Sequence, residues 1–276
     1  MSADELTAAT VGPLLGTGWL GHAWWHVAAC GSTNDLAAAW ARGEAPEAPG
    51  AGRAPHGAVV VTEIQERGRG RHGRRWHQAP GESLAMSIVL RPPLPPARLP
   101  PLTLVAGVAV AEAVARHDVQ PQLKWPNDVL AGDGGPGGRG RKLAGILTEL
   151  VGDAVVVGIG VNLNAAELPD EIAAIATTLR RERGGRAVDR ALFAAALCER
   201  LEAWTERFVA EGPAPVAAAW RGFADFFGAP IALVDGARRT DGIADGLDDD
   251  GALRVRLPDG RTLRVIAGEV LPGSLS

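Results

Sequence analysis

The sequence has few cysteines, no long apolar run and no excess of positive charge. Cys30 and Cys198 are too few for a disulfide framework or a zinc cluster. The longest apolar stretch, residues 102–115, falls short of a membrane span and contains Glu112. The first residues show no basic region followed by an apolar stretch, so no secretory signal is visible. We therefore expect a cytoplasmic protein without a membrane partner.

The net charge of −4 argues against a protein that holds nucleic acid through bulk charge. Hydrophobic residues make up 46% of the chain and charged residues 22%, which excludes disorder, collagen and coiled coil as its main state. A length of 276 residues suits one large domain, or a large and a small one. No internal repeat is visible.

The spacing of apolar residues predicts an α/β fold. A first helix at residues 3–15 is interrupted by Gly12 and Pro13, and a second follows the helix-start pattern Ser32–Asp35. Further helices are predicted at residues 102–116 and 187–211. Strands are predicted at residues 27–29, 58–64, 84–90, 123–125, 129–130, 142–151 and 154–163.

A small β unit is predicted after Pro230. Its strands are expected at residues 231–234, 238–244, 253–257 and 262–267. Asp-Gly pairs at residues 235–236, 241–242, 250–251 and 259–260 are predicted to form turns. We expect a small β-barrel or meander. The boundary is placed near Gly228, which divides the chain into residues 1–228 and 229–276.

A tract rich in arginine and glycine, Gln65–Trp76, lies between two predicted strands. Glycines let a backbone approach a ligand, and arginines match carboxylates and phosphates. A solvated basic loop or an RNA-binding tail is the alternative. The tract occurs once and carries one aromatic residue, Trp76, at its end. These features favour a loop that closes over a small anionic ligand.

Two polar segments follow short strands. In Lys124–Asp128, Asn127 and Asp128 suit a hydrated Mg²⁺ that also contacts phosphates, or an Asx-turn that caps backbone amides. In residues 141–150, strict alternation places Lys142 on one face and Gly145 on the other. Lys142 is either a ligand-binding cation or an edge-strand charge. Residues 158–164 lack the spacing and the helix of a dinucleotide-binding motif.

In their order along the chain, these segments resemble biotin–protein ligases. The matching segments are Ser32–Asn34, Gln65–Trp76, Lys124–Asp128, Lys142–Glu149 and Gly158–Asn162. The resemblance implies an α/β (α+β) catalytic domain, residues 1–228, with a mixed sheet and helices against one face, related to class II aminoacyl-tRNA synthetases. It also implies an SH3-like β-barrel at residues 229–276.

Members of that family join biotin and MgATP into biotinoyl-5′-AMP and release pyrophosphate. They then transfer biotin to a lysine of the biotin carboxyl carrier domain of a biotin-dependent carboxylase. The resemblance therefore implies biotin as substrate, ATP with Mg²⁺, and that carrier domain as partner, without nucleic acid.

The resemblance also assigns residues by position. Those expected to bind biotin are Ser32, Thr33, Asn34, Gln65, Gly68, Arg69, Gly70, Arg71, Lys142 and Gly145. Those expected to bind ATP and the adenylate are Arg69, Arg71, Arg74, Trp76, Lys124, Asn127 and Asn162. Lys142, Arg69 and Arg71 are the expected catalytic residues, and Asp128 is the expected metal ligand. Ser32 as a helix cap, Trp76 as a core residue and Asn162 as a turn cap remain alternatives.

The chain departs from some relatives at two places. About 25 residues precede the predicted catalytic domain, too few for a winged helix–turn–helix, so we expect a short form without DNA binding. The glycine-rich tract at 132–140 is predicted to be a flexible hairpin tip. Two other functions compete. A lipoate or octanoate ligase shares the fold but is expected to lack these motifs, and an RNA-binding module would use the arginines.

Overall fold

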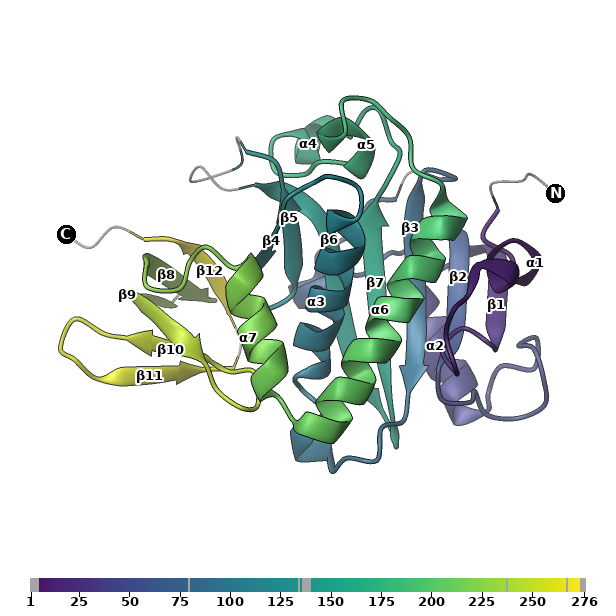
Figure 1. The fold of residues 1–276 in the computed structure, drawn as a ribbon, viewed down its shortest axis with the longest axis horizontal. Helices are drawn as coiled ribbons and strands as arrows, with labels where there is room; N and C mark the ends of the chain where they lie inside the picture. The colour runs from purple at the N-terminus through teal and green to yellow at the C-terminus, as the bar shows by residue number, and fades with distance from the viewer. Residues whose placement is uncertain are drawn as a thin grey trace.

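Two β-sheets organise the chain (Figure 1). The computed structural model describes residues 5–273 except 79, 134, 136–139, 237 and 267. The larger sheet has seven strands in the order β1-β2-β3-β7-β6-β5-β4, with β1 parallel to β2 and the other neighbours antiparallel. It is therefore a mixed sheet, as predicted. Its strands are β1 (Trp24–Cys30), β2 (Ala58–Gln65), β3 (Ser83–Leu90), β4 (Pro121–Lys124), β5 (Asp128–Ala131), β6 (Arg141–Val151) and β7 (Ala154–Asn162).

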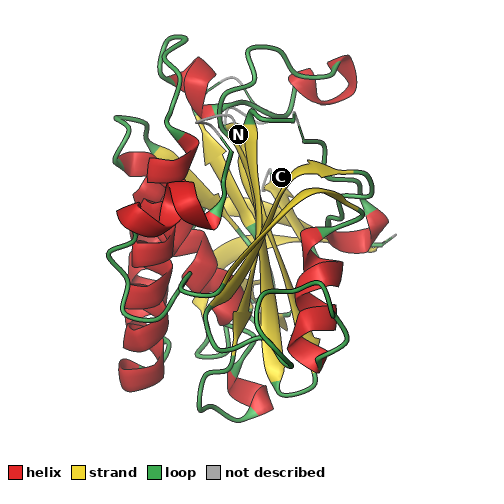
Figure 2. Cartoon of the chain, turned by 90° about the vertical axis from the view of Figure 1, so that its right-hand side faces the viewer, coloured by secondary structure: helices red, strands yellow, loops and turns green. Residues whose placement is uncertain are grey.

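Helices lie on both faces of this sheet (Figure 2). Helices α3 (Leu102–Ala115) and α6 (Arg190–Glu211) pack on the face that carries Val59 and Val61. Helix α2 (Thr33–Arg42) packs on the opposite face, with Ala58 and Val60, because side chains alternate along a strand. The expectation of helices against one face is therefore wrong for α2. The candidate site lies on the α2 side.

Helix α3 is apolar all round because it is enclosed. Eleven of its 14 residues are buried, and it packs against both the sheet and α6. Together with the turn η3 (Pro96–Arg98), it forms a stretch, Pro96–Ala115, long and apolar enough by length and composition to cross a membrane. The prediction that no stretch reaches this length is corrected. The most apolar window is 72% buried inside the protein, which accounts for its composition.

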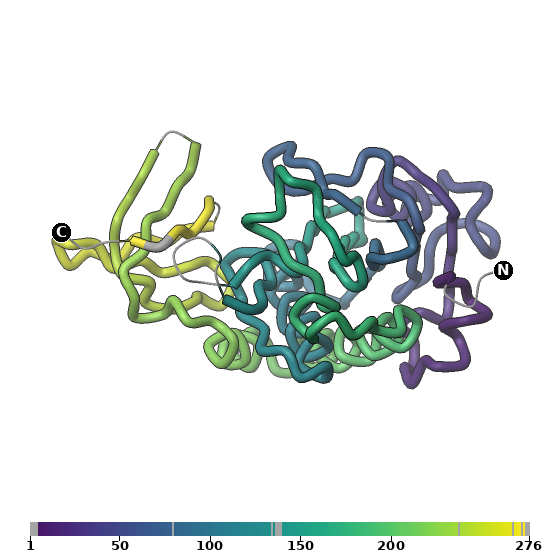
Figure 3. Tube along the Cα trace, turned by 90° about the horizontal axis from the view of Figure 1, so that it is seen from above, coloured from purple at the N-terminus to yellow at the C-terminus, as the bar shows by residue number. Residues whose placement is uncertain are grey.

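The smaller sheet lies at the end of the molecule away from the N-terminal segment (Figure 3). Its strands are antiparallel, in the order β11-β10-β9-β8-β12. Among the residues that the structure describes, this pairing does not close, so the meander is correct and the closed barrel is not. The strands are β8 (Pro230–Asp235), β9 (Arg238–Leu247), β10 (Leu253–Arg256), β11 (Thr262–Val265) and β12 (Glu269–Pro272).

The predicted turn at Asp241–Gly242 is wrong because both residues lie inside β9. A Cβ on Gly242 would lie 2.6 Å from Val255 Cγ1 and 2.7 Å from the Arg256 carbonyl oxygen. The glycine at this position therefore allows close packing of β10 rather than a change of direction.

Several short elements were not predicted. They are α4 (Asp170–Ala173), α5 (Leu179–Glu182), α7 (Ala214–Phe223) and β12. The first predicted helix is reduced to α1 (Ala8–Val11) and the turn η1 (Gly12–Leu14), and its residues 3 and 4 lie outside the described residues. The glycine-rich tract connects the paired strands β5 and β6. Its residues 134 and 136–139 also lie outside the described part.

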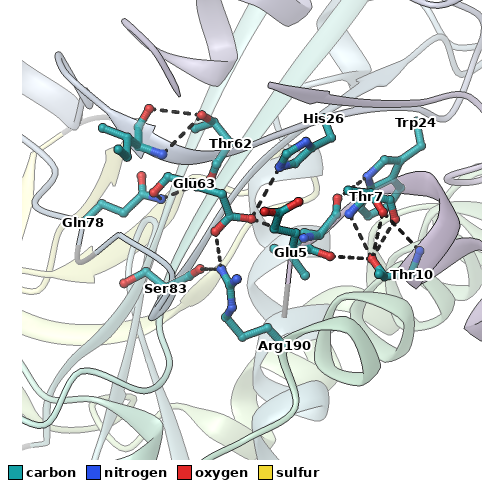
Figure 4. Close-up of polar contacts among 12 residues, drawn as sticks. Glu5, Thr7, Thr10, Trp24, His26, Thr62, Glu63, Gln78, Ser83 and Arg190 are labelled. Carbon is teal, nitrogen blue, oxygen red and sulfur yellow. Dashed lines mark hydrogen bonds and ion pairs between the residues drawn. The ribbon is translucent and has the colours of Figure 1, made fainter. Parts of the chain in front are cut away.

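A buried ion pair fixes the end of β2, where the arginine-glycine tract begins (Figure 4). Arg190 Nη1, at the start of α6, lies 2.7 Å from Glu63 Oε2 and donates to the Ser83 carbonyl oxygen at 3.2 Å. The His26 ring lies 3.5 Å from the other oxygen of Glu63. Gln78 Nε2 donates to the carbonyl oxygens of residues 62 and 63. Both ends of the tract are therefore attached to the same strand.

Candidate active site

A cavity of about 360 Å³ lies on the α2 side of the large sheet. Fourteen of the sixteen predicted site residues line it, although they come from four separate segments of the chain. The two that do not line it are Gly68 and Asn162. These fourteen are Ser32, Thr33, Asn34, Gln65, Arg69, Gly70, Arg71, Arg74, Trp76, Lys124, Asn127, Asp128, Lys142 and Gly145.

Glycines on two neighbouring strands form the floor of the cavity. Gly145 of β6 pairs with Gly160 of β7, and Gly158 lies two residues earlier on the same face. A Cβ on Gly158 would collide with Asn34 Oδ1, and one on Gly160 would collide with the indole of Trp76. Gly158 and Gly160 were missed as site residues. The signal that could have identified them is their spacing of two within a buried strand, because a glycine in a strand often marks a place where a ligand approaches closely.

Amide and hydroxyl groups meet at one end of the floor. The Ser87 hydroxyl lies 2.6 Å from Asn34 Oδ1 and 2.7 Å from Thr33 Oγ1. Asn34 Nδ2 donates to Glu149 Oε2 at 2.6 Å and to the Leu147 carbonyl oxygen at 3.2 Å. These side chains offer donors and acceptors in a largely buried place, which suits a neutral polar head group.

The start of α2 completes this end of the cavity. The Thr33 N–H donates to Gln65 Oε1 at 3.0 Å, which links the helix to the end of β2. Ser32 occupies the N-cap position, but its side chain makes no capping hydrogen bond. The interpretation of Ser32 as only a helix cap therefore loses its basis, and its buried hydroxyl borders the cavity.

The arginine-glycine tract forms a loop over the cavity. The Gly70 N–H donates to the Arg74 carbonyl oxygen at 2.7 Å, and the Trp76 N–H donates to that of Gly68 at 2.9 Å. Gly68 does not line the cavity, but a Cβ there would lie 2.7 Å from the Trp76 carbonyl oxygen. Its role is to let the two sides of the loop approach each other.

The loop arginines are held by polar side chains around the cavity. Arg69 Nη2 lies 2.8 Å from Asp35 Oδ1 and 2.9 Å from Glu149 Oε2. Arg71 Nη1 donates to Asn127 Oδ1 at 3.3 Å. Burial lowers the pKa of Arg71, and the negative charge of Asp128 raises it. The guanidinium nevertheless stays charged at neutral pH. These arginines therefore form a preorganised set of cations.

Lys142 lies at the centre of the cavity because β6 contains a bulge. Val129 pairs with Ala144 but Leu130 pairs with Lys142, so Leu143 is the extra residue. The bulge reverses the predicted alternation, and Lys142 Cε comes within 3.1 Å of a Cβ built on Gly145. The prediction that these two residues lie on opposite faces is wrong for this reason.

Two side-chain contacts and one backbone hydrogen bond fix the position of Lys142. Its Nζ lies 2.6 Å from Asp128 Oδ1, and it is 5.7 Å from the centre of the Trp76 ring. Its backbone N–H donates to the Ile175 carbonyl oxygen at 2.8 Å. An edge-strand charge pointing into solvent would make none of these contacts, so this interpretation does not hold.

The residues after Trp125 do not form a simple Asx-turn. Asn127 Nδ2 donates to the Ile146 carbonyl oxygen, 2.8 Å away on β6, and Asp128 pairs with Lys142. Both side chains thus face the cavity. Trp76 is half-buried over the glycine floor instead of in the core, and its Nε1 has no hydrogen-bond partner within the described ranges.

Asn162 is placed outside the cavity. Its Nδ2 donates to the Thr177 carbonyl oxygen at 3.1 Å. The Thr177 N–H in turn donates to the Lys142 carbonyl oxygen at 2.9 Å. The structure therefore gives Asn162 a part in holding the segment beside Lys142, and its expected contact with ATP stays a prediction.

Glu269 of β12 also lines the cavity, and sequence reasoning missed it. It accepts hydrogen bonds from Arg74 Nη2 and, at 3.2 Å, from Lys124 Nζ. The Arg74 hydrogen bond, with Lys124 beside it, lowers the pKa of Glu269 to about 2. No local pattern marks this residue because its partners lie well over a hundred positions away. Lys124, the second partner of Glu269, is one of only two lysines in the sequence, and the other is Lys142.

The donors present suit a metal that arrives with a ligand. Within the described residues, no group of three or more His, Cys, Asp or Glu side chains is placed to hold a metal ion. Asp128 is one carboxylate at the cavity wall, and Mg²⁺ commonly takes one or two carboxylates together with substrate phosphates. Taken as a whole, the cavity has a neutral polar end at Asn34 and a cationic end at the loop arginines and Lys142.

Comparison with known proteins agrees with this geometry. Residues 51–164 match the Biotin/lipoate A/B protein ligase family, and residues 226–271 match the SH3-like Biotin protein ligase C terminal domain. The structure is similar to that of the biotin protein ligase from Aquifex aeolicus in complex with biotin and ATP. The TM-score is 0.75 at 27% identity, covering 91% of this chain and 98% of the other.

Sequence relatives point the same way. The chain is 34% identical over 215 residues to the bifunctional ligase/repressor BirA of Bacillus subtilis (strain 168), covering 75% of this chain and 64% of that protein. It is 37% identical over 252 residues to the biotin--[acetyl-CoA-carboxylase] ligase of Mycobacterium tuberculosis (strain H37Rv), covering 89% of this chain and 87% of the relative. The chain therefore belongs to the biotin–protein ligase family.

Proposed function

We propose that this protein activates biotin with ATP to biotinoyl-5′-AMP, releases pyrophosphate, and transfers biotin to a lysine of a biotin carboxyl carrier domain. The supporting observation is the cavity itself, in which a neutral polar pocket at Asn34 adjoins a cluster of cations. Biotin has a neutral ring system that suits the first and a carboxylate that must meet the phosphates at the second.

The first step joins two anions. A carboxylate oxygen of biotin attacks the α-phosphorus of ATP, and the bond to pyrophosphate breaks. Arg69, Arg71 and Lys142 surround this place with positive charge before the reactants arrive. Preorganised cations stabilise the developing charge without the cost of reorienting solvent. Lys142 acts as a compact point charge, and the arginines act as forks that bind two oxygens at once.

Asp128 has a second role in this account. In the structure its carboxylate holds Lys142 at 2.6 Å over the glycine floor. When ATP carries Mg²⁺ into the cavity, Asp128 together with phosphate oxygens would hold the ion, which neutralises phosphate charge. Asp128 therefore positions Lys142 and is the carboxylate best placed to meet the metal.

The second step is acyl transfer. The amine of the acceptor lysine attacks the carbonyl carbon of the mixed anhydride, AMP leaves, and the amine loses a proton. The loop Gln65–Trp76 covers the cavity, so it shields the anhydride from water until the acceptor is present. We propose a catalytic domain at residues 1–228, a C-terminal domain at residues 229–276, and action in the cytoplasm.

The alternative functions have less support. In an RNA-binding tail the arginines would make no fixed contacts with the rest of the fold, whereas Arg69, Arg71 and Arg74 each contact a side chain around the cavity. A lipoate ligase remains an outcome of the test. The midpoint temperature of thermal unfolding should rise with biotin plus MgATP and stay unchanged with lipoate plus MgATP. Only a ligand that binds the native state raises this temperature. A larger rise with lipoate would overturn the proposal.

A further inference from the structure

Glu269 occupies an unusual place for a carboxylate. It belongs to β12 of the small sheet, yet its side chain enters the cavity of the large sheet and contacts both Arg74 and Lys124. Arg74 is on the loop over the cavity, and Lys124 ends β4. One acidic side chain thus connects three separate parts of the structure.

Both partners of Glu269, Arg74 and Lys124, are cations that the resemblance to biotin–protein ligases assigns to ATP and the adenylate. A carboxylate and a phosphate cannot share the same donors of Arg74 and Lys124, since both are anions that would also repel each other. Burial lowers the pKa of Arg71, while Asp128 and Glu269 act in the opposite direction, so the field of Glu269 reaches the third cation as well. Any polyphosphate that enters must compete with Glu269.

We propose that Glu269 is a resident counter-ion that holds Arg74 and Lys124 in the unliganded protein and is displaced by the polyphosphate portion of the nucleotide. This inference rests on the proposed function and deepens it, because it gives the small sheet a direct part in nucleotide binding. The carboxylate keeps the loop attached to β12 until a ligand takes over its cations.

The geometry allows the exchange without refolding. Register in the small sheet is set by the backbone pairing of Glu269 with Val234. The side chains of the pair remain partly exposed, 32% for Glu269 and 65% for Arg74, so rotation of side chains is enough to separate them. Because the pKa of Glu269 is about 2, it stays ionised and competes equally over the neutral pH range.

The direct test is the binding of inorganic pyrophosphate, measured by titration calorimetry without biotin. We expect Glu269→Gln to bind pyrophosphate about 3- to 10-fold more tightly than the unmodified protein, since one or two charge-assisted contacts no longer compete. Asp241→Asn is the matched control. It removes a carboxylate of the same sheet that pairs with the exposed Arg239, and it should leave the affinity unchanged.

A second readout reports on the loop. Without pyrophosphate, trypsin should cleave Glu269→Gln faster than the unmodified protein at the loop arginines, and saturating pyrophosphate should remove the difference. Glu269→Ala, which cannot accept a hydrogen bond from Arg74, should behave in the same way. Melting curves identify a variant that is not folded.

Unchanged or weaker pyrophosphate binding in both folded Glu269 variants would overturn the inference, because it would show that Glu269 does not compete for these cations. Equal cleavage of the loop would overturn it too. These measurements need neither biotin nor turnover. A failure of the proposed ligase activity is therefore seen separately, as absence of biotin-dependent pyrophosphate release.

Discussion

Lys142 Nζ lies 2.6 Å from Asp128 Oδ1, and the two residues meet only because a bulge in β6 turns the lysine onto the same face as Gly145. The pair brings a cation and a carboxylate to the floor of the cavity, beside the loop arginines. An anionic ligand there meets a cation whose position is already fixed.

Replacing Lys142 by Gln removes this charge while keeping a donor. We expect biotin-dependent pyrophosphate release to fall by about 10²–10³-fold, the usual loss for one preorganised electrostatic contact. The Lys142→Arg variant should also keep little of this activity, because a planar guanidinium cannot occupy the place of a compact ammonium. The assay is pyrophosphate release under saturating biotin and MgATP. Activity within a few-fold of the unmodified protein, with an unchanged melting curve, would reduce Lys142 to a surface charge.

The Gly158→Ala variant tests whether biotin binding needs the glycine floor of the cavity. Gly158→Ala places a methyl group against Asn34 Oδ1, and the amide must leave Ser87 and Glu149. We expect biotin affinity, measured by calorimetry, to fall at least about 10-fold, because overpacking of this kind costs about 1–3 kcal/mol. The matched control is Gly222→Ala in helix α7, where a Cβ meets nothing within 4 Å. It should bind biotin normally. Equal affinities in the two variants would refute this role of the floor.

The Arg71→Gly variant tests whether the loop Gln65–Trp76 keeps the adenylate inside the cavity. Arg71→Gly removes the contact with Asn127 and adds a flexible residue to a loop that already has three glycines at positions 68, 70 and 73. We expect adenylate to escape and biotin to appear on lysines of an unrelated protein added to the mixture. The measurement is streptavidin blotting of that bystander. A variant that still forms adenylate but labels the acceptor alone would contradict the account.

The scarcity of lysine provides an internal control for that experiment. Lys124 and Lys142 pair with carboxylates inside the cavity, so the Arg71→Gly chain offers few amines to its own escaped adenylate. Mass spectrometry should find the bystander labelled at many lysines. On the ligase, label should be limited to its amino terminus and these two positions.

The pH dependence of stability tests the contact of Glu269 with Arg74 and Lys124. The pKa of Glu269 is lowered from 4.5 to about 2 in the folded protein. Its contribution to the free energy of unfolding is therefore present above the pKa of the unfolded chain and is lost as the pH falls toward 2. Because the pair is partly exposed, we expect only about 1 kcal/mol. The unfolding free energies of the unmodified protein and Glu269→Gln should differ by this amount at pH 7 and converge near pH 2. A constant difference would contradict the assignment.

Local patterns in the sequence predicted much of the fold. A run of β-branched residues marked β2, an apolar run marked β3, and an alanine-rich apolar run marked α3. Features that depend on distant contacts were not predictable in this way. The face of Lys142 depends on a bulge opposite β5, and the contact of Glu269 with Arg74 joins the small sheet to the loop over the cavity. The Asp241–Gly242 pair matched a turn motif, but close packing against β10 determines its conformation.

The candidate site followed from the order of its motifs and could not be derived from any one of them. Asn34 and Gln65 carry no chemical signature alone, and they gain a role only where α2 and β2 meet. The expectation that Asn162 binds ATP, which rests on its position in the motif, stays a prediction. Its amide is used to hold Thr177, which no sequence pattern indicates.

In the proposed function, biotin and ATP react with each other in the one cavity. The most direct measurement is pyrophosphate release by the purified protein with MgATP, with and without biotin, followed by addition of an unmodified biotin carboxyl carrier domain. We expect release only when biotin is present, with lipoate and octanoate inactive, and biotin on a single lysine of the carrier. Release that needs lipoate or octanoate instead of biotin, or no release with any of the three by a folded protein, would contradict it.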